Sequence, residues 1–307
     1  MADLPFYYRL SDTTDREERI EDDAMCAAFR EAWPDRVILI EPSSVFPEDG
    51  ICFGRRKRNE LTGAADLPYW QDHGFLSSIS RDFKLCDIEE AEAEVARLHG
   101  EGKDAFLKAT CMKLMVAMVP RGASIYGAIG DMVYSLIDRP DSLLVQEAVD
   151  MRHEHRFVVI DGEIVTHSPV QTTLTPHSRG EIFTTRGGKL VPGHAIETLH
   201  FSTPSSGSPP IQDLDLTRKM IAHVECLLEK TDRPDLIVDV CELPDGRIET
   251  IEFNPMVPGG FGLYGCDPVK IARACGKLAA RAAEFQASTG WPQPAGHLEV
   301  DEDFLDI

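Results

Sequence analysis

The sequence lacks the features that mark membrane proteins and proteins that bind nucleic acid. No run of residues approaches the roughly 18 consecutive apolar residues that a membrane-spanning helix needs. The segment Met1–Asp12 has no apolar core of the kind that a secretory signal peptide carries. Positive charge is scarce, because 31 Lys and Arg stand against 52 Asp and Glu, which gives a net charge of −21. Such a surface repels polyphosphate, so we expect a soluble, cytoplasmic protein whose partners are neither nucleic acid nor membrane.

Paired cysteine motifs are absent as well. The eight cysteines stand singly, none of them in a Cys-x-x-Cys arrangement, and several lie within apolar runs. This usage is typical of reduced structural thiols and argues against a zinc site. Hydrophobic residues make up 43% of the chain, which is enough for a folded core. Much of the acid lies in runs such as Asp15–Asp23, a pattern typical of solvated surface.

The hydrophobic pattern predicts a chain that contains both helices and strands. Residues 1–83 are expected to form a small N-terminal α/β unit, and residues 291–307 an acidic tail. The elements predicted for the first unit are a strand near Pro5–Leu10, a helix at Thr14–Trp33 and a short buried strand at Arg36–Glu41.

Turn and cap signals mark elements between residues 84 and 290. Asp87 begins a helix that ends at Gly100, and two hairpins turn at Asp161-Gly162 and at Pro244–Arg247. The polar stretch 169–213 between the hairpins is long for an ordinary loop. The other predicted elements are strands at Ala105–Ala109, Leu114–Val119 and Leu143–Val149, and helices at Ser124–Asp138, Leu214–Thr231 and Asp267–Phe285.

The second hairpin carries polar side chains where a strand is usually apolar. If its turn leaves two or four residues unpaired, Asp239 lies opposite Glu252, with Asn254 on the same face. Facing carboxylates repel unless a cation lies between them, and three oxygen-bearing side chains favour Mg²⁺ or Mn²⁺. Because Mg²⁺ held by few carboxylates completes its shell with water and phosphate oxygens, the face implies a bound nucleotide. The alternative is a solvent-facing edge with acids on its wet side, and a three-residue loop would undo the pairing.

Several basic residues are candidates for contacts with an anion. Lys108 is a cation inside an apolar strand, where either a phosphate or an internal acid would compensate its charge. Lys84 fits an exposed side chain equally well. Arg156 shares a strand face with Glu154, so an internal ion pair is the alternative to a phosphate contact. The basic run Arg55–Arg58 either meets an anionic substrate or neutralises acidic neighbours.

Taken in order, these segments resemble the ATP-grasp superfamily from about Asp82 to Tyr264. In detail the chain looks similar to a divergent branch that includes the cell-division-cycle ATP-grasp proteins and small phage and bacterial ATP-grasp ligases. Thr110–Gly122 departs from the family pattern, because it lacks the glycine-rich phosphate loop of many members. The segments that carry the resemblance are Phe-Leu-Lys108, Leu-Leu-Val-Gln-Glu-Ala-Val-Asp150, Glu154-His-Arg156-Phe-Val-Val-Ile-Asp-Gly, Val-Asp239-Val and Ile-Glu252-Phe-Asn254-Pro.

The resemblance implies an α+β protein with the ATP-grasp fold, in which two α+β subdomains clasp ATP, here with the small N-terminal unit added. Residues 84–150 would form the small (lid) subdomain, and residues 151–290 the large subdomain with the metal site. It implies that Lys108 contacts the phosphates of ATP, with Lys84 as a second cation. Glu147 and Val149 would present backbone groups to adenine, and Asp150 would hold the ribose.

The same resemblance assigns the reacting end of the site. Arg156 would face the γ-phosphate or an acyl phosphate. The magnesium ions would be held by side chains of the second hairpin, namely Asp239, Glu252 and Asn254.

The residues themselves suggest further substrate contacts. Arg179 and Arg186 either order over an anionic substrate or belong to a mobile surface loop. Gly259 and Gly260 either permit close approach of a substrate or only shape the turn into the Asp267 helix.

The function implied is that of an ATP- and magnesium-dependent ligase. Such an enzyme joins a small-molecule or peptide carboxylate to an amine through an acyl phosphate and releases ADP. Two alternatives stay open at this point, since the resemblance also covers them. One is an ATP-binding assembly chaperone of the cell-division-cycle type, and the other is a small-molecule kinase.

Overall fold

The structure, a computed structural model, describes residues 5–14, 16–45, 47, 50–54, 69–110, 116–130, 136, 143–149, 151–169, 214–255 and 262–289. The chain divides into two compact units, a larger one of Met1–Ser78 with Arg152–Ile307 and a smaller one of Ile79–Met151. Among the described helices, none is both long and apolar enough to cross a membrane. The cysteines that the structure describes are free thiols.

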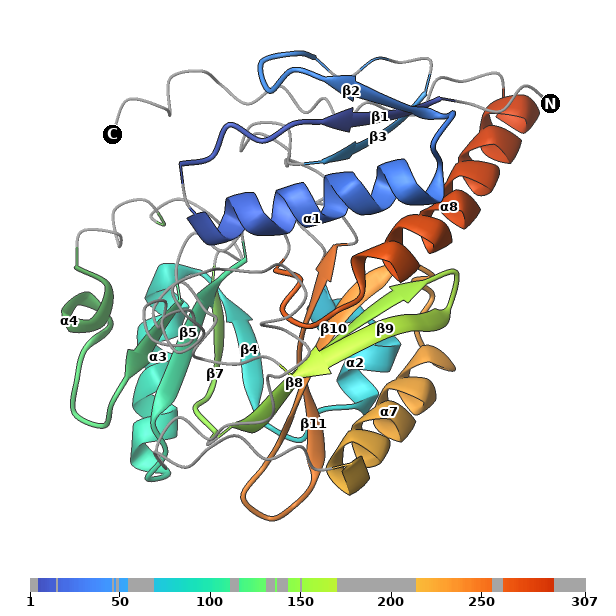
Figure 1. Cartoon of the computed structure of the whole chain (residues 1–307). Helices are drawn as coiled ribbons and strands as arrows, with labels where there is room; N and C mark the ends of the chain where they lie inside the picture. The colour runs from blue at the N-terminus through green and yellow to red at the C-terminus, as the bar shows by residue number, and fades with distance from the viewer. Residues whose placement is uncertain are drawn as a thin grey trace, which may run out of the picture. The chain divides into compact units, whose positions relative to one another are not determined.

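The larger unit contains a three-stranded parallel sheet in the order β2-β1-β3. Its strands are β1 (Phe6–Arg9), β2 (Val37–Ile40) and β3 (Ile51–Gly54), and helix α1 (Arg16–Ala32) connects the first two. A parallel pair needs such a crossover, because the chain must return to the same end of the sheet. In Figure 1, α1 lies along this sheet, and it also packs against helix α8 (Pro268–Thr289).

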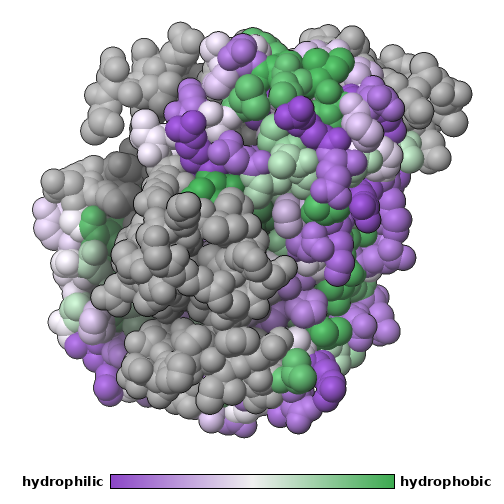
Figure 2. All heavy atoms as spheres, in the orientation of Figure 1, coloured by the Kyte–Doolittle hydropathy of each residue, from purple (hydrophilic) through white to green (hydrophobic). Residues whose placement is uncertain are grey.

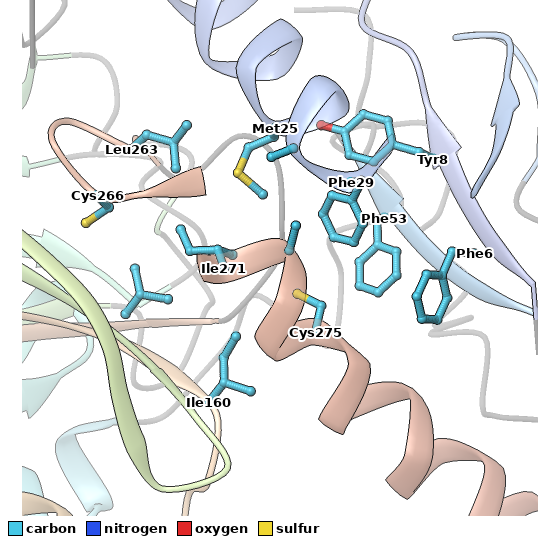
Figure 3. Packing of buried hydrophobic residues seen from close by; sticks show 13 residues of the cluster. Phe6, Tyr8, Met25, Phe29, Phe53, Ile160, Leu263, Cys266, Ile271 and Cys275 are labelled. Carbon is cyan, nitrogen blue, oxygen red and sulfur yellow. The ribbon is translucent and has the colours of Figure 1, made fainter. Parts of the chain in front are cut away.

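Aromatic side chains join this sheet to the C-terminal half of the larger unit. The ring of Phe53 lies 5.4 Å from that of Phe6 and 4.4 Å from that of Phe29 on α1, measured between centroids. Figure 3 shows Cys275 of α8 and Ile160 of the neighbouring sheet in the same buried cluster. The predicted N-terminal unit therefore shares a hydrophobic core with residues beyond 151.

Strand β2 forms where predicted, but the expectation that it is buried is wrong. Ile38 is 45% exposed and Leu39 is 41% exposed. The reason is topological, since β2 is an edge strand of the three-stranded sheet and pairs with β1 alone. Figure 2 shows an apolar area in green at the top of the molecule, over the region that this sheet occupies in Figure 1. An apolar run of four residues does not distinguish a central strand from an edge strand.

A four-stranded antiparallel sheet in the order β11-β10-β8-β9 forms the second layer of the larger unit. Both predicted hairpins are confirmed. Asp161 and Gly162 turn the first one with φ values of 60° and 72°, as a type I′ turn requires. The four strands are β8 (Arg152–Ile160), β9 (Glu163–Pro169), β10 (Leu236–Glu242) and β11 (Ile248–Pro255).

Helices cover both faces of this sheet. One face receives α7 (Leu214–Leu228), α2 (His73–Ser77) and the 3-10 turn η2 (Tyr69–Gln71). Phe75 of α2 anchors this side, because its ring lies 5.6 Å from that of Phe253 on β11. The opposite face carries Val158 and Ile160, which pack against α8. Asp267 caps α8 as predicted, accepting the backbone N–H of Val269 at 2.9 Å.

The smaller unit is an antiparallel sheet in the order β4-β7-β5-β6, with one face covered by a helix. Its strands are β4 (Phe83–Cys86), β5 (Ala105–Ala109), β6 (Val116–Val119) and β7 (Leu143–Glu147), and the covering helix is α3 (Ile88–Gly100). The predicted cap is confirmed, since Asp87 accepts the N–H of Glu90 at 2.8 Å. Helix α4 (Ile125–Ile129) lies within the predicted Ser124–Asp138 and ends where Gly130 takes a φ of 55°, and most of the predicted span beyond Gly130 lies outside the described residues.

Gly276 of α8 is expected to tolerate no side chain. An added Cβ would lie 2.5 Å from Cζ2 of Trp33, whose Nε1 is held by the carbonyl of Ala272 at 2.8 Å. We therefore expect Gly276→Ala to lower the free energy of unfolding in urea by about 1–3 kcal/mol. The matched control is Gly100→Ala in α3, where no atom lies within 4 Å of the added Cβ. It should stabilise by less than about 1 kcal/mol, and equal effects of the two substitutions would contradict the packing described here.

Candidate functional site

The predicted pairing of Asp239 with Glu252 is confirmed, although the turn differs from the one assumed. Leu243 N–H donates to the carbonyl of Arg247 at 2.8 Å, which leaves a loop of three residues with Gly246 at a φ of 81°. Such a loop alone would turn Glu252 to the opposite face. A β-bulge at Ile251 inserts one extra residue between the pairs Val240–Thr250 and Asp239–Glu252 and so restores the register.

The three predicted metal ligands, Asp239, Glu252 and Asn254, come together on one face of the sheet and are called the acidic cluster below. The amide nitrogen of Asn254 donates to Asp239 Oδ2 at 3.1 Å and to Glu252 Oε1 at 2.9 Å. Asp239 is 1% exposed and Asn254 8% exposed, whereas Glu252 is half-buried. The alternative of a wholly solvent-facing edge is therefore wrong, because two of the three side chains are buried.

Arg156 forms an ion pair with Asp239, whereas the sequence left open a phosphate contact or an internal pair with Glu154. The guanidinium and the carboxylate meet in two parallel bonds, Nε to Oδ1 at 2.8 Å and Nη2 to Oδ2 at 2.6 Å. The pair forms because β8 lies beside β10 with Arg156 opposite Asp239, a neighbour relation that local spacing does not reveal. Burial alone would lower the pKa of Arg156, but the charge and hydrogen bonds of Asp239 raise it above its ordinary value.

The segment 262–267, which follows β11, packs against Arg156. Nη1 of Arg156 donates to the carbonyl of Gly262 at 2.9 Å, and its guanidinium lies 4.8 Å from the centroid of the Tyr264 ring. With the two bonds to Asp239, at least three of the five N–H groups of the arginine are engaged. The arginine is thus fixed from two sides, by a strand neighbour and by a loop.

Three side chains from two elements, β9 and α1, hold the 262–267 segment in place. Ser168 Oγ accepts the N–H of Gly265 at 2.7 Å, and Thr166 Oγ1 accepts the N–H of Asp267 at 3.0 Å. Glu21 of α1 accepts the N–H of Leu263 at 2.8 Å. Sequence reasoning missed all three. For Glu21 a signal existed, because Met25 and Ala28 share its helical face and both are buried.

The acidic cluster has the chemistry that a hard divalent cation requires. The charges of Asp239, Glu252 and Arg156 sum to a formal charge of −1. Glu154 carries a further negative charge, which acts on Tyr264. Turned by 180°, the carboxamide of Asn254 would present an oxygen in place of its nitrogen. In the described part of the chain, no three His, Cys, Asp or Glu side chains are grouped to hold a metal ion. Two carboxylates and a carboxamide would therefore need water or phosphate oxygens to complete a shell around Mg²⁺.

In the smaller unit, Lys84 and Lys108 lie on opposite faces of the sheet. Lys84 pairs with Val145, on the face that α3 covers, and its Nζ is 4.0 Å from Glu90 Oε1. Lys108 pairs with Leu144, on the other face. The register therefore places the two lysines on opposite faces of the sheet, and the phosphate contacts of Lys108 and of Lys84 stay predictions.

The backbone after β7 is partly used within the sheet. The N–H of Glu147 donates to the carbonyl of Asp82, and that of Ala148 to the carbonyl of Asp104, both at 2.9 Å. These two bonds engage the N–H groups of Glu147 and Ala148. The adenine contacts of Glu147 and Val149 stay predictions. Several other predicted residues lie outside the described residues: Asp150, Arg179, Arg186, Gly259, Gly260 and the run Arg55–Arg58.

Known proteins match this chain in structure and not in sequence. No family model matches it, and no curated protein does. Among solved structures, D-cycloserine synthetase DcsG has a TM-score of 0.51 at 13% identity, over 90% of this chain and 99% of that one. A RimK domain ATP-grasp protein from Sphaerobacter thermophilus has a TM-score of 0.49 at 16% identity, over 90% and 99%. The ATP-grasp ligase PsnB, solved with Mg and ADP, has a TM-score of 0.43 at 12% identity, over 91% and 98%.

The similarity to D-cycloserine synthetase DcsG, which extends over 90% of this chain, concerns the overall fold. The chain has the ATP-grasp fold, an α+β architecture, as the sequence predicted. At this level of identity the comparison concerns the fold, and the site must be judged from its own residues.

The two carboxylates of the acidic cluster should respond differently to loss of charge. Asp239→Asn removes the countercharge of buried Arg156, so we expect a loss of about 3–5 kcal/mol in the free energy of unfolding. Glu252→Gln changes a half-buried group whose donor, the amide of Asn254, is neutral and can still bond to the new carboxamide, so we expect less than about 1 kcal/mol. Chemical denaturation of both variants checks this. Equal losses would mean that the Arg156–Asp239 pair does not carry the stability assigned to it.

Proposed function

We propose that this protein is an ATP- and Mg²⁺-dependent ligase that joins a carboxylate to an amine. The observation that carries the proposal is the acidic cluster beside a buried arginine, in a chain with the ATP-grasp fold. In phosphoryl transfer, the protein mainly neutralises charge and positions groups in line. A surface that pairs oxygen ligands with one fixed guanidinium meets both needs.

The residues of the larger unit have distinct proposed tasks. Glu252 and Asn254, with Asp239, would hold Mg²⁺, which neutralises charge on the phosphates when bound. Arg156, fixed by Asp239 and Gly262, would face the phosphoryl group in transfer with its positive charge. Its rigid seat matters, because donors that are already oriented cost no reorganisation at the transition state.

The smaller unit is proposed to hold the rest of the nucleotide. Lys108 would contact the phosphates, and the backbone at Glu147 and Val149 would meet the adenine edge.

The proposed reaction proceeds in two balanced steps. An oxygen of the carboxylate attacks the γ-phosphorus and ADP leaves. The amine attacks the resulting acyl phosphate, the C–O bond to phosphate breaks, and the amine loses a proton as the amide forms.

Binding of Mg²⁺-AMPPNP tests the cluster without knowledge of the substrates. We expect Glu252→Gln to weaken binding by about tenfold to a hundredfold, because it removes a charged ligand of the cation. Asp245→Asn is the matched control, since Asp245 is an exposed acid in the turn of the same hairpin. Calorimetric titration of both variants measures the difference. If Glu252→Gln binds as tightly as the control, the cluster does not hold the metal.

Release of ADP identifies the reaction type. A ligase should release ADP only when a carboxylate and an amine are both present, and it should form an amide in equal amount. Release with a single acceptor, which becomes phosphorylated, would instead show a kinase. Binding of Mg²⁺-AMPPNP without any ADP release across a panel of acceptors would favour an ATP-dependent assembly factor.

A further inference from the structure

A carboxylate of the N-terminal helix reaches the segment that fixes Arg156. Glu21 projects from α1 and accepts the N–H of Leu263 through Oε1 at 2.8 Å. Its helical face is the buried one, because Met25 is 1% exposed and Ala28 2% exposed. The contact joins residues 242 positions apart in the sequence.

The residues on either side of Leu263 connect this contact to Arg156, because both of them touch its guanidinium. Gly262, directly before Leu263, gives its carbonyl to Arg156, and a Cβ at Gly262 would lie 2.9 Å from Nη1 of the arginine. Tyr264, directly after Leu263, has a φ of 48°, a conformation that side-chain-bearing residues rarely adopt. Its ring lies against the guanidinium. Such a backbone persists only when its surroundings hold it.

We propose that Glu21 is a positioning residue, which holds Arg156 in its seat through the Gly262–Tyr264 backbone. The hydrogen bond from the N–H of Leu263 to Glu21 is called the tether below. The role of Arg156 rests on the proposed function, whereas the tether itself does not. The N-terminal helix thereby becomes part of the site, although it supplies no group to the reacting atoms.

The titration of Glu21 gives a readout that a merely structural residue would not. Burial raises the pKa of Glu21 to about 7, although the N–H groups of Leu263 and Tyr264 and the charge of Arg156 lower it. The titratable and charged groups that face it are Asp22 on its own helix, Arg156 on β8, and Tyr264 and Cys266. The pKa values of Tyr264 and Cys266 are raised to about 12, so both stay neutral near pH 7.

The sign of the pH effect follows from linkage. In the closed form, in which residues 262–267 contact Glu21, the Glu21 carboxyl has a pKa of about 7. In an open form, in which this segment is detached, the pKa would return toward its ordinary value of 4.5. The closed form therefore binds more protons, and it loses stability relative to the open form as pH rises through 7. For full exposure on opening, the opening constant should rise about tenfold between pH 6 and pH 8.

Hydrogen exchange of residues 262–267 measures this opening directly, after correction for the intrinsic pH dependence of exchange. In the wild type, we expect protection to fall about tenfold from pH 6 to pH 8. Glu21→Gln keeps the acceptor without the charge and should stay protected at both values. Glu21→Ala should lose protection at both. Asp23→Asn, an exposed acid on the same helix, should behave as the wild type.

Two outcomes of that experiment would overturn the tether. One is Glu21→Ala protected as well as the wild type at pH 6. The other is Glu21→Gln with the pH dependence of the wild type. Because Glu21→Gln is isosteric, it decides the question even if Glu21→Ala does not fold.

Affinity for Mg²⁺-AMPPNP then tests whether the tether positions Arg156. At pH 6, we expect Glu21→Ala to bind about threefold to tenfold more weakly than Asp23→Asn, since loss of a hydrogen bond to an oriented group costs this much. Equal affinities would overturn the positioning role. If the wild type itself does not bind, the proposed function fails, and the exchange experiment still decides the tether.

Discussion

The buried pair of Arg156 and Asp239 is the interaction on which the rest of the site depends. It joins the two central strands of the larger antiparallel sheet, where both side chains are almost completely removed from solvent. An ion pair at such a place contributes little net stability, yet removal of either partner is costly. The pair is therefore better understood as a device that fixes two side chains in one orientation. Asn254 extends it to Glu252, and Gly262 extends it to the loop after β11.

The N-terminal residues belong to the same construction. Their three-stranded sheet shares a core with α8 and β8, and their helix sends Glu21 to the loop that contacts Arg156. A buried carboxylate is unfavourable unless polar groups surround it, and here the compensation comes from backbone N–H groups of that loop. The acids of α1 are thus of two kinds, since Asp23 is exposed to solvent whereas Glu21 is part of the packing.

The candidate site was predictable in part from the sequence. Glu252 and Asn254 were predictable because strand alternation places them on one face and because polar side chains are out of place there, whereas the position of Asp239 opposite Glu252 depends on the bulge at Ile251. The ion-pair partner of Arg156 was not predictable, since it depends on which strand lies beside β8. The faces of Lys84 and Lys108 depend likewise on the register of β4 and β5 against β7. Glu21 was overlooked because its acidic neighbours resemble solvated surface.

By itself the sequence determined the features that rest on interactions within a few residues. These are the Asp161-Gly162 turn, the caps at Asp87 and Asp267, and the order of elements that indicated an ATP-grasp fold. Only the tertiary structure decided the exposure of β2, the bulge at Ile251 that brings Glu252 beside Asp239, and the contact of Glu21 with Leu263. The physical reason is the separation along the chain of the residues that interact. A cap or a turn is made by neighbours in the chain, whereas register, burial and ion pairing are set by which distant segments pack together.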